Sequence, residues 1–95
     1  MPPTFEFDPE KDTANHAKHG LSLARIRDAV WPPEFVAEDA RRDYAENRWY
    51  AYVQLDKRIH VVIFTLRGAS VRVISLRKAN QREVRRYNDQ LSERR

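Results

Sequence analysis

The 95-residue chain contains no cysteine and only two glycines, Gly20 and Gly68. Without cysteine, disulfide bonds, thiolate metal sites and cysteine nucleophiles are all excluded. A glycine-rich phosphate-binding loop is excluded as well, because such loops need several glycines close together and these two lie far apart. Each glycine is instead expected to mark a reversal of the chain.

Long apolar runs are also missing from the sequence. None approaches the roughly 18 residues that a membrane-spanning helix needs. The N-terminal stretch MPPTFEFDPEKD is acidic and lacks the basic segment and apolar run of a secretion signal. We therefore expect a cytoplasmic protein that does not enter a membrane.

The composition is that of a folded protein. Hydrophobic residues make up 41% of the chain, charged residues 34%, and there are ten aromatic residues. A disordered chain has few aromatic residues, so this content favours a packed core. At this length one compact domain is expected, covering residues 1–95.

Positive charge is concentrated at the C-terminal end. Residues 67–95 carry nine arginines and lysines against three acids, whereas residues 1–66 carry nine against eleven. The two balances, +6 and −2, give the net charge of +4. This asymmetry indicates a polyanionic partner, either nucleic acid or an acidic protein, although a solvated basic helix has the same composition.

The chain is predicted to begin with a strand and a helix. Residues 4–7, TFEF, alternate polar and apolar side chains, as a short half-buried strand does. Asp8 can cap the free N–H groups of a helix, and Pro9 suits its first position. The helix is expected to end near His19, with Gly20 as its left-handed cap.

A second helix is predicted close behind the first. Ser22 can cap a helix over residues 23–30, which the pair Pro32-Pro33 would end. Ala29, Val30 and Trp31 are then expected in or near the core. Residues 33–48 are polar and are interpreted as a long connection, with one short strand near residues 35–36.

Three further strands are predicted to form a meander. Residues 49–55 alternate as a strand, residues 56–58 form a turn, and the nearly continuous apolar run of residues 60–66 is typical of a central strand covered on both faces. Residues 67–69 form the next turn, and residues 70–76 form the third strand.

A C-terminal helix follows the meander. Asn80 and Glu83 have the spacing of a capping box, and Val84, Tyr87 and Leu91 recur at the spacing of one helix face. The predicted order is β-α-α-β-β-β-α. The fold class is therefore α+β, an antiparallel meander with helices packed against it.

The three histidines are the first candidates for metal ligands. His16 and His19 lie three residues apart on the first helix, so both can point to one side. A zinc site needs one or two further ligands, and neither cysteine nor a His-Glu-x-x-His motif supplies them. We therefore predict no metal and no cofactor, with His19 placed at the helix end and His60 structural.

The basic residues near the third meander strand are the stronger candidates. Arg72 alternates with valines and is expected to share a strand face with Ile74 and Leu76, where a guanidinium is costly unless it reaches solvent or a partner. Arginine suits phosphate because its planar fork donates two parallel hydrogen bonds. The cations expected to gather where the strand meets the helix are Arg77, Lys78, Arg82, Arg85 and Arg86.

Taken together, these residues resemble the BrnT-type toxins. The resemblance covers roughly residues 5–88 and rests on two blocks in matching order. The residues of the first block are Phe7-Asp8-Pro9, Lys11, Asn15 and Lys18-His19-Gly20-Leu21-Ser22. Those of the second are Phe64-Thr65, Arg67-Gly68, Arg72-Val73-Ile74-Ser75, Arg77-Lys78-Ala79, Glu83 and Tyr87.

The resemblance implies a RelE-like fold and ribonuclease activity without a metal. It implies a toxin of a type II toxin–antitoxin pair, neutralised by a ribbon-helix-helix antitoxin of the BrnA type. RNA is then the substrate, and operator DNA is contacted only indirectly, through the antitoxin. The C-terminal helix could also serve as the surface on which the antitoxin docks.

Metal-free RNA cleavage needs a base for the 2′-OH, an acid for the leaving 5′ oxygen and cations for the transition state. We assign charge stabilisation to Arg72 and Arg77, with Lys78 and Arg86 at neighbouring phosphates and Arg82 and Arg85 as further phosphate contacts. The candidates for proton transfer, among which the sequence does not choose, are His19, Lys18, Glu83 and Tyr87. For Glu83 the capping role is an alternative, and for Tyr87 a place in the core. A non-catalytic module that binds nucleic acid or an acidic partner is the competing interpretation.

Overall fold

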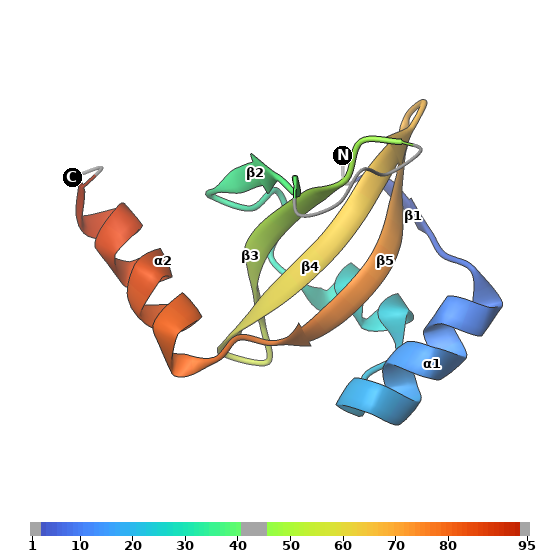
Figure 1. The fold of residues 1–95 in the computed structure, drawn as a ribbon, viewed down its shortest axis with the longest axis horizontal. Coiled ribbons are helices and arrows are strands. Elements are labelled where there is room, and N and C mark those ends of the chain that lie inside the picture. The colour runs from blue at the N-terminus through green and yellow to red at the C-terminus, as the bar shows by residue number, and fades with distance from the viewer. Residues whose placement is uncertain (1–2, 41–45, 94–95) are drawn as a thin grey trace.

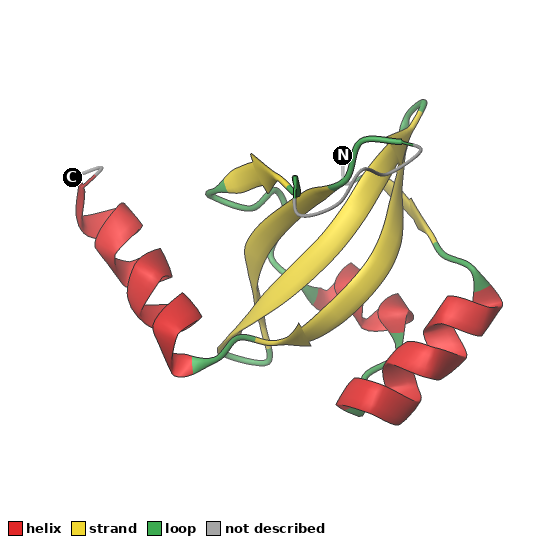
Figure 2. Ribbon diagram, in the orientation of Figure 1, coloured by secondary structure: helices red, strands yellow, loops and turns green. Residues whose placement is uncertain are grey.

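The computed structural model describes residues 3–40 and 46–93. A five-stranded sheet in the order β1-β5-β4-β3-β2 forms the centre of the molecule, with helices on both sides (Figures 1 and 2). The elements are β1 (Thr4–Glu6), α1 (Pro9–His19), the 3-10 helix η1 (Leu23–Asp28), β2 (Val36–Glu38), β3 (Trp49–Leu55), β4 (Arg58–Arg67), β5 (Ser70–Lys78) and α2 (Gln81–Glu93). The α+β class is confirmed.

The meander of β3, β4 and β5 is antiparallel, as predicted. Asp56 and Lys57 both have positive φ, at 53° and 61°, which is the geometry of a two-residue turn that matches the twist of the adjoining strands. Gly68, with φ of 58°, makes the second reversal. Because these turns are tight, β4 runs two residues further at its start and one further at its end than the sequence pattern indicated, while β5 runs two residues further where it leads to α2.

The sheet as a whole is mixed, because strands outside the predicted antiparallel meander join it at both edges. β1 pairs in parallel with the start of β5, with Phe5 opposite Val71. β2 adds a fifth strand at the opposite edge, antiparallel to β3. β2 confirms the short strand predicted near residues 35–36 in the connection over residues 33–48, of which residues 41–45 lie outside the described part of the chain.

A β-bulge in β5 corrects the predicted position of Arg72. Ile63 pairs with Ser75 and Phe64 pairs with Val73, so that Ile74 is the extra residue. The bulge shifts the alternation of side chains, and Leu76 points to the same face as Val73 rather than to that of Arg72. As a consequence Arg72 and Arg77, which strict alternation would put on opposite faces, share one face.

The larger core lies between the sheet and the layer of α1 and η1. Its buried residues include Leu23 and Ile26 of η1 and Val62, Val73 and Leu76 of the central strands. Ala29 and Trp31 pack against this core as expected. Val30 does not: the residue is 63% exposed, because η1 ends at Asp28 as a 3-10 helix instead of continuing to residue 30 as predicted.

A smaller cluster on the opposite face joins α2 to the sheet. Tyr87 of α2 is buried, and its ring meets those of Tyr52 on β3 and Phe35 at centroid distances of 6.2 and 5.9 Å. Leu91 packs against the same cluster. Of the three helix residues predicted to share a buried face, Tyr87 and Leu91 are confirmed there, whereas Val84 lines a separate hollow with Arg58.

The first α-helix begins and ends as the sequence predicts, and the second begins as predicted. The carboxylate of Asp8 accepts a hydrogen bond of 2.8 Å from the backbone N–H of Glu10, and Gly20 has φ of 72°. In α2, Asn80 and Glu83 exchange hydrogen bonds of 2.8 and 2.9 Å, which confirms the capping box. No helix within the described residues is long and apolar enough to cross a membrane.

Asn15 attaches α1 to the edge of β5. Since β1 pairs only with Ser70–Arg72, the second half of β5 borders α1 instead of a strand. The buried amide of Asn15 donates to the carbonyl oxygen of Leu76 at 2.9 Å and accepts from its N–H at 3.1 Å. It also donates to the carbonyl oxygen of Leu21 at 2.9 Å. The Asn15 side chain thereby takes the place of a strand beside Leu76 of β5, and it also holds the segment after α1 at Leu21.

Replacement of Asn15 by alanine is expected to destabilise the protein by about 2 to 4 kcal/mol, because it leaves both backbone groups of Leu76 buried and unpaired. The free energy of unfolding from urea titration measures this. Asn88→Ala, at an exposed position of α2, is the control and should change stability by less than about 0.5 kcal/mol. Equal effects of the two substitutions would contradict the proposed role of Asn15.

Candidate functional site

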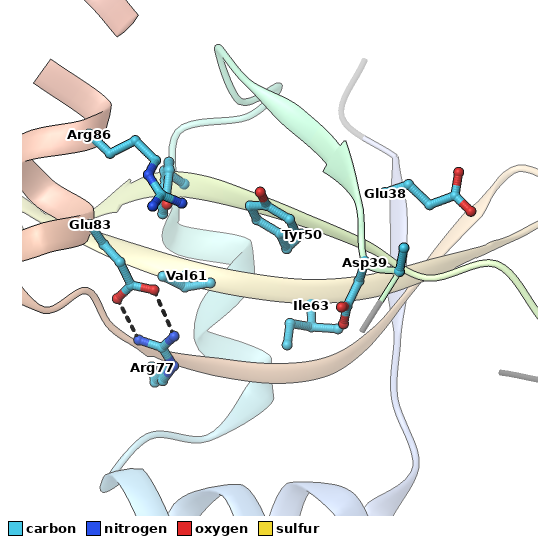
Figure 3. Close-up of a pocket in the computed structure, with 10 residues that line it drawn as sticks. Glu38, Asp39, Tyr50, Val61, Ile63, Arg77, Glu83 and Arg86 are labelled. Atoms are coloured by element: carbon cyan, nitrogen blue, oxygen red, sulfur yellow. Dashed lines mark hydrogen bonds and ion pairs between the residues drawn. The ribbon is translucent and has the colours of Figure 1, made fainter. Parts of the chain in front are cut away.

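A groove of ≈ 450 Å³ lies between the sheet face that carries Arg77 and the first turns of α2 (Figure 3). Its floor is apolar, formed by Val61 and Ile63 of β4. Arg77 of β5 and Glu83 of α2 stand at one end, and Asp39, after β2, stands at the other (Figure 3). The remaining lining residues are Glu38, Ala40, Tyr50, Tyr52 and Arg86.

Arg77 and Glu83 form a two-pronged ion pair at the end of the groove. Two guanidinium nitrogens of Arg77 each donate to one carboxylate oxygen of Glu83, both at 2.8 Å. The hydrogen bonds from Arg77 have the largest effect on the pKa of Glu83, and they lower it. Burial opposes them, whereas the backbone N–H of Asn80 and the charge of Arg86 lower the pKa further. Glu83 is therefore held as a carboxylate, and it fixes the guanidinium plane of Arg77.

Arg86 and two tyrosines form the side of the groove below α2. Burial raises the pKa of Tyr52, and the neighbouring guanidinium of Arg86 partly offsets this by its charge and by hydrogen bonding. The ring of Tyr50 is half-buried and meets that of Tyr52 edge-on, with centroids 6.3 Å apart. Arg86 itself is exposed. A cation and an aromatic ring thus face the same space, side by side along the groove (Figure 3).

His19 stands at the end of α1, near Arg77 but on the other side of β5. Burial lowers the pKa of His19, and the positive charges of Lys18 and Arg77 lower it further. The imidazole is therefore neutral at pH 7 and able to accept a proton. Lys18 is exposed and His16 is exposed one turn earlier. His60 is buried in β4, as expected of a structural residue.

The residues predicted to form the site lie in different parts of the structure. Arg77, Glu83 and Arg86 come together in the groove, with His19 close enough to respond to the charge of Arg77. Arg72 lies toward the far end of the strand, where its guanidinium is 3.8 Å from the carboxylate of Glu6.

The other predicted cations and Tyr87 lie outside this group. Lys78 and Arg82 are exposed at the junction of β5 and α2. Arg85 lines a separate hollow with Arg58. Tyr87 is buried, and its hydroxyl accepts a hydrogen bond of 3.3 Å from the side-chain amide of Gln54.

Several groove residues were missed from the sequence. Tyr50 and Tyr52 have the two-residue spacing that puts side chains on one face of a strand, and this alternation could have indicated an aromatic wall. The same spacing applies to Val61 and Ile63. Asp39 gave no such signal, because its position depends on the pairing of β2 with β3.

The groove has the chemistry of a site for a phosphate that carries a flat apolar group. Guanidinium groups pair with phosphate oxygens, and an aromatic wall above an apolar floor accepts a planar ring. Among the described residues, no three histidine or acidic side chains are grouped so that they could hold a metal ion.

A comparison with protein families identifies the chain. The family model that matches it, over residues 7–83, is described as the ribonuclease toxin BrnT of type II toxin–antitoxin systems. A search of curated proteins finds no significant match. The matched segment includes strands β2 to β5 of the sheet and reaches the Arg77–Glu83 pair of the groove. The chain therefore belongs to the BrnT family of ribonuclease toxins of type II toxin–antitoxin systems.

Proposed function

We propose that this protein cleaves RNA in the groove between α2 and the sheet, without a metal. The observation that carries the proposal is the convergence of Arg77 and Arg86 on a space walled by Tyr50. Guanidinium groups stabilise the extra negative charge that develops on a phosphate during cleavage. An adjacent ring stacks on an unpaired base, which is how proteins generally hold single-stranded RNA.

In this mechanism the 2′ oxygen attacks phosphorus and the 5′ oxygen leaves, which yields a 2′,3′-cyclic phosphate and a 5′-hydroxyl end. Arg77, held in place by Glu83, and Arg86 stabilise the charged transition state. Glu83 serves as the positioning residue of Arg77, because its lowered pKa makes it a weak proton acceptor. Tyr87 supports the groove from the core, where its ring packs on that of Tyr52.

His19 is proposed as the general base that takes the proton of the 2′-OH, from RNA that leaves the groove at Arg77 and passes the end of α1. Its lowered pKa keeps the imidazole neutral and ready to accept a proton at neutral pH. Lys18 contributes by its charge, which helps to hold that pKa down. The proton for the leaving 5′ oxygen comes from solvent in the groove. Arg72, Lys78, Arg82 and Arg85 lie further away and serve as contacts to flanking phosphates.

The partner proposed for this toxin is a ribbon-helix-helix antitoxin that neutralises it by covering the groove and α2. Operator DNA then meets the toxin only through that complex. We place the activity in the cytoplasm, where the RNA substrate is, and we assign the fold to the RelE-like group. The three-stranded antiparallel meander between N-terminal helices and a C-terminal helix supports this assignment.

Arg77→Ala is expected to reduce RNA cleavage by about 100- to 1000-fold, the usual effect of losing one transition-state donor. Cleavage is measured on purified, antitoxin-free protein with a 5′-labelled RNA, with and without ribosomes. The control is Arg67→Ala, which removes an exposed arginine at the other end of the meander. Near-wild-type cleavage by Arg77→Ala would remove Arg77 from the site, whereas RNA left intact by the unmodified protein would favour the non-catalytic binding module.

The pH dependence of cleavage tests the role of His19. The protonated imidazole cannot accept a proton, so kcat/KM should fall as the pH drops, with a midpoint below the ordinary histidine pKa of 6.5. Lys18→Ala removes a neighbouring positive charge and should move this midpoint to higher pH. His19→Ala should abolish the acid limb and reduce the rate by about 100- to 10,000-fold. His16→Ala is the control, and an unchanged acid limb in His19→Ala would exclude His19 as the base.

A further inference from the structure

A second hollow, of ≈ 310 Å³, lies on the other side of Tyr50 and Arg86 from the groove. Tyr50, Tyr52 and Arg86 line both spaces and so form the ridge between them. The other walls of the second hollow include Phe35, Ala37 of β2 and Gln90 of α2. Neither Arg77 nor Glu83 lines this hollow, and the mechanism described above uses only its ridge, at Arg86 and Tyr50.

Gln90 carries an unusual feature for a residue at the wall of a hollow. Its side-chain oxygen Oε1 is buried, and within the described part of the chain it accepts no hydrogen bond. A buried acceptor without a donor costs free energy, so such atoms are rare and call for a physical reason. The oxygen has almost no exposed surface, so it meets a donor only if the amide turns toward the hollow, and a ligand there that offers an N–H group favours that turn.

The spacing of Gln90 and Arg86 suits one nucleotide. The two residues lie four apart on α2, so their side chains emerge one above the other on the same helix face, with Cβ atoms about 5–6 Å apart. Arg86 can hold a phosphate on the ridge while the amide of Gln90 reaches the edge of the attached base. Tyr50 and Phe35 provide aromatic rings at the same hollow.

We propose that this second hollow is a nucleobase subsite, in which Gln90 recognises a base by its exocyclic amino group. The glutamine amide accepts from an amino group and donates to the neighbouring ring nitrogen, a pattern that adenine satisfies best. Gln90 is thus a specificity-determining residue for the base next to the phosphate at Arg86. The inference rests on the proposed function, because it takes RNA as the ligand of the groove.

The test is a binding titration that does not depend on cleavage. The probes are two 2′-O-methyl tetranucleotides, one of adenosine and one of purine riboside, which lacks only the 6-amino group. The unmodified protein should bind the adenosine probe about 5- to 150-fold more tightly, the discrimination that a paired amide contact provides. Gln90→Leu should remove this preference, whereas Asn88→Leu, on the opposite side of α2, should retain it.

The stability of the variants separates recognition from structure. Gln90→Leu replaces an unpaired buried acceptor by an apolar group of similar size, so its melting temperature should stay equal or rise. The subsite would be overturned if the unmodified protein bound the two probes equally well. It would also be overturned if Gln90→Leu still preferred the adenosine probe. The protein could also prefer the adenosine probe and yet leave the corresponding 2′-hydroxyl RNA uncleaved. That result would support the subsite and reject the ribonuclease mechanism.

Discussion

The amide of Asn15, bonded to both backbone groups of Leu76, is the contact on which the arrangement of this protein depends. A sheet edge exposes unpaired N–H and C=O groups, and here a side chain from α1 pairs with them in place of a strand. The same contact fixes the end of α1. His19 lies one helical turn beyond Asn15, and Arg77 follows Leu76 directly, so a structural amide places the proposed base beside the proposed phosphate-binding arginine.

The β-bulge and the capping box complete that arrangement. The bulge at Ile74 turns Leu76 into the core and Arg77 toward α2. Glu83 then serves two purposes, because it caps the first turn of α2 and also holds the guanidinium of Arg77. The groove is therefore built from contacts that also stabilise the fold. Loss of the carboxylate should disturb the start of the helix and the orientation of the arginine together.

Local rules predicted most of the elements and part of the site. The caps at Asp8 and Gly20 and the capping box depend on neighbouring residues alone, and these were predictable from sequence. The bulge at Ile74 was not, because it depends on how β5 pairs with β4, and it reversed the predicted face of Leu76. The aromatic wall at Tyr50 was missed for a related reason: alternation gives a shared strand face, but the position of α2 decides which face becomes a groove.

The central claim is that RNA lies in the groove under α2 and not on the other basic surfaces. Its most direct test is NMR mapping with a non-cleavable 2′-O-methyl RNA, observing arginine Nε–Hε and tyrosine ring signals. The account predicts that the signals of Arg77, Arg86 and Tyr50 shift on binding. Shifts confined to Arg58 and Arg85, which line the hollow on the far side of α2, would contradict it.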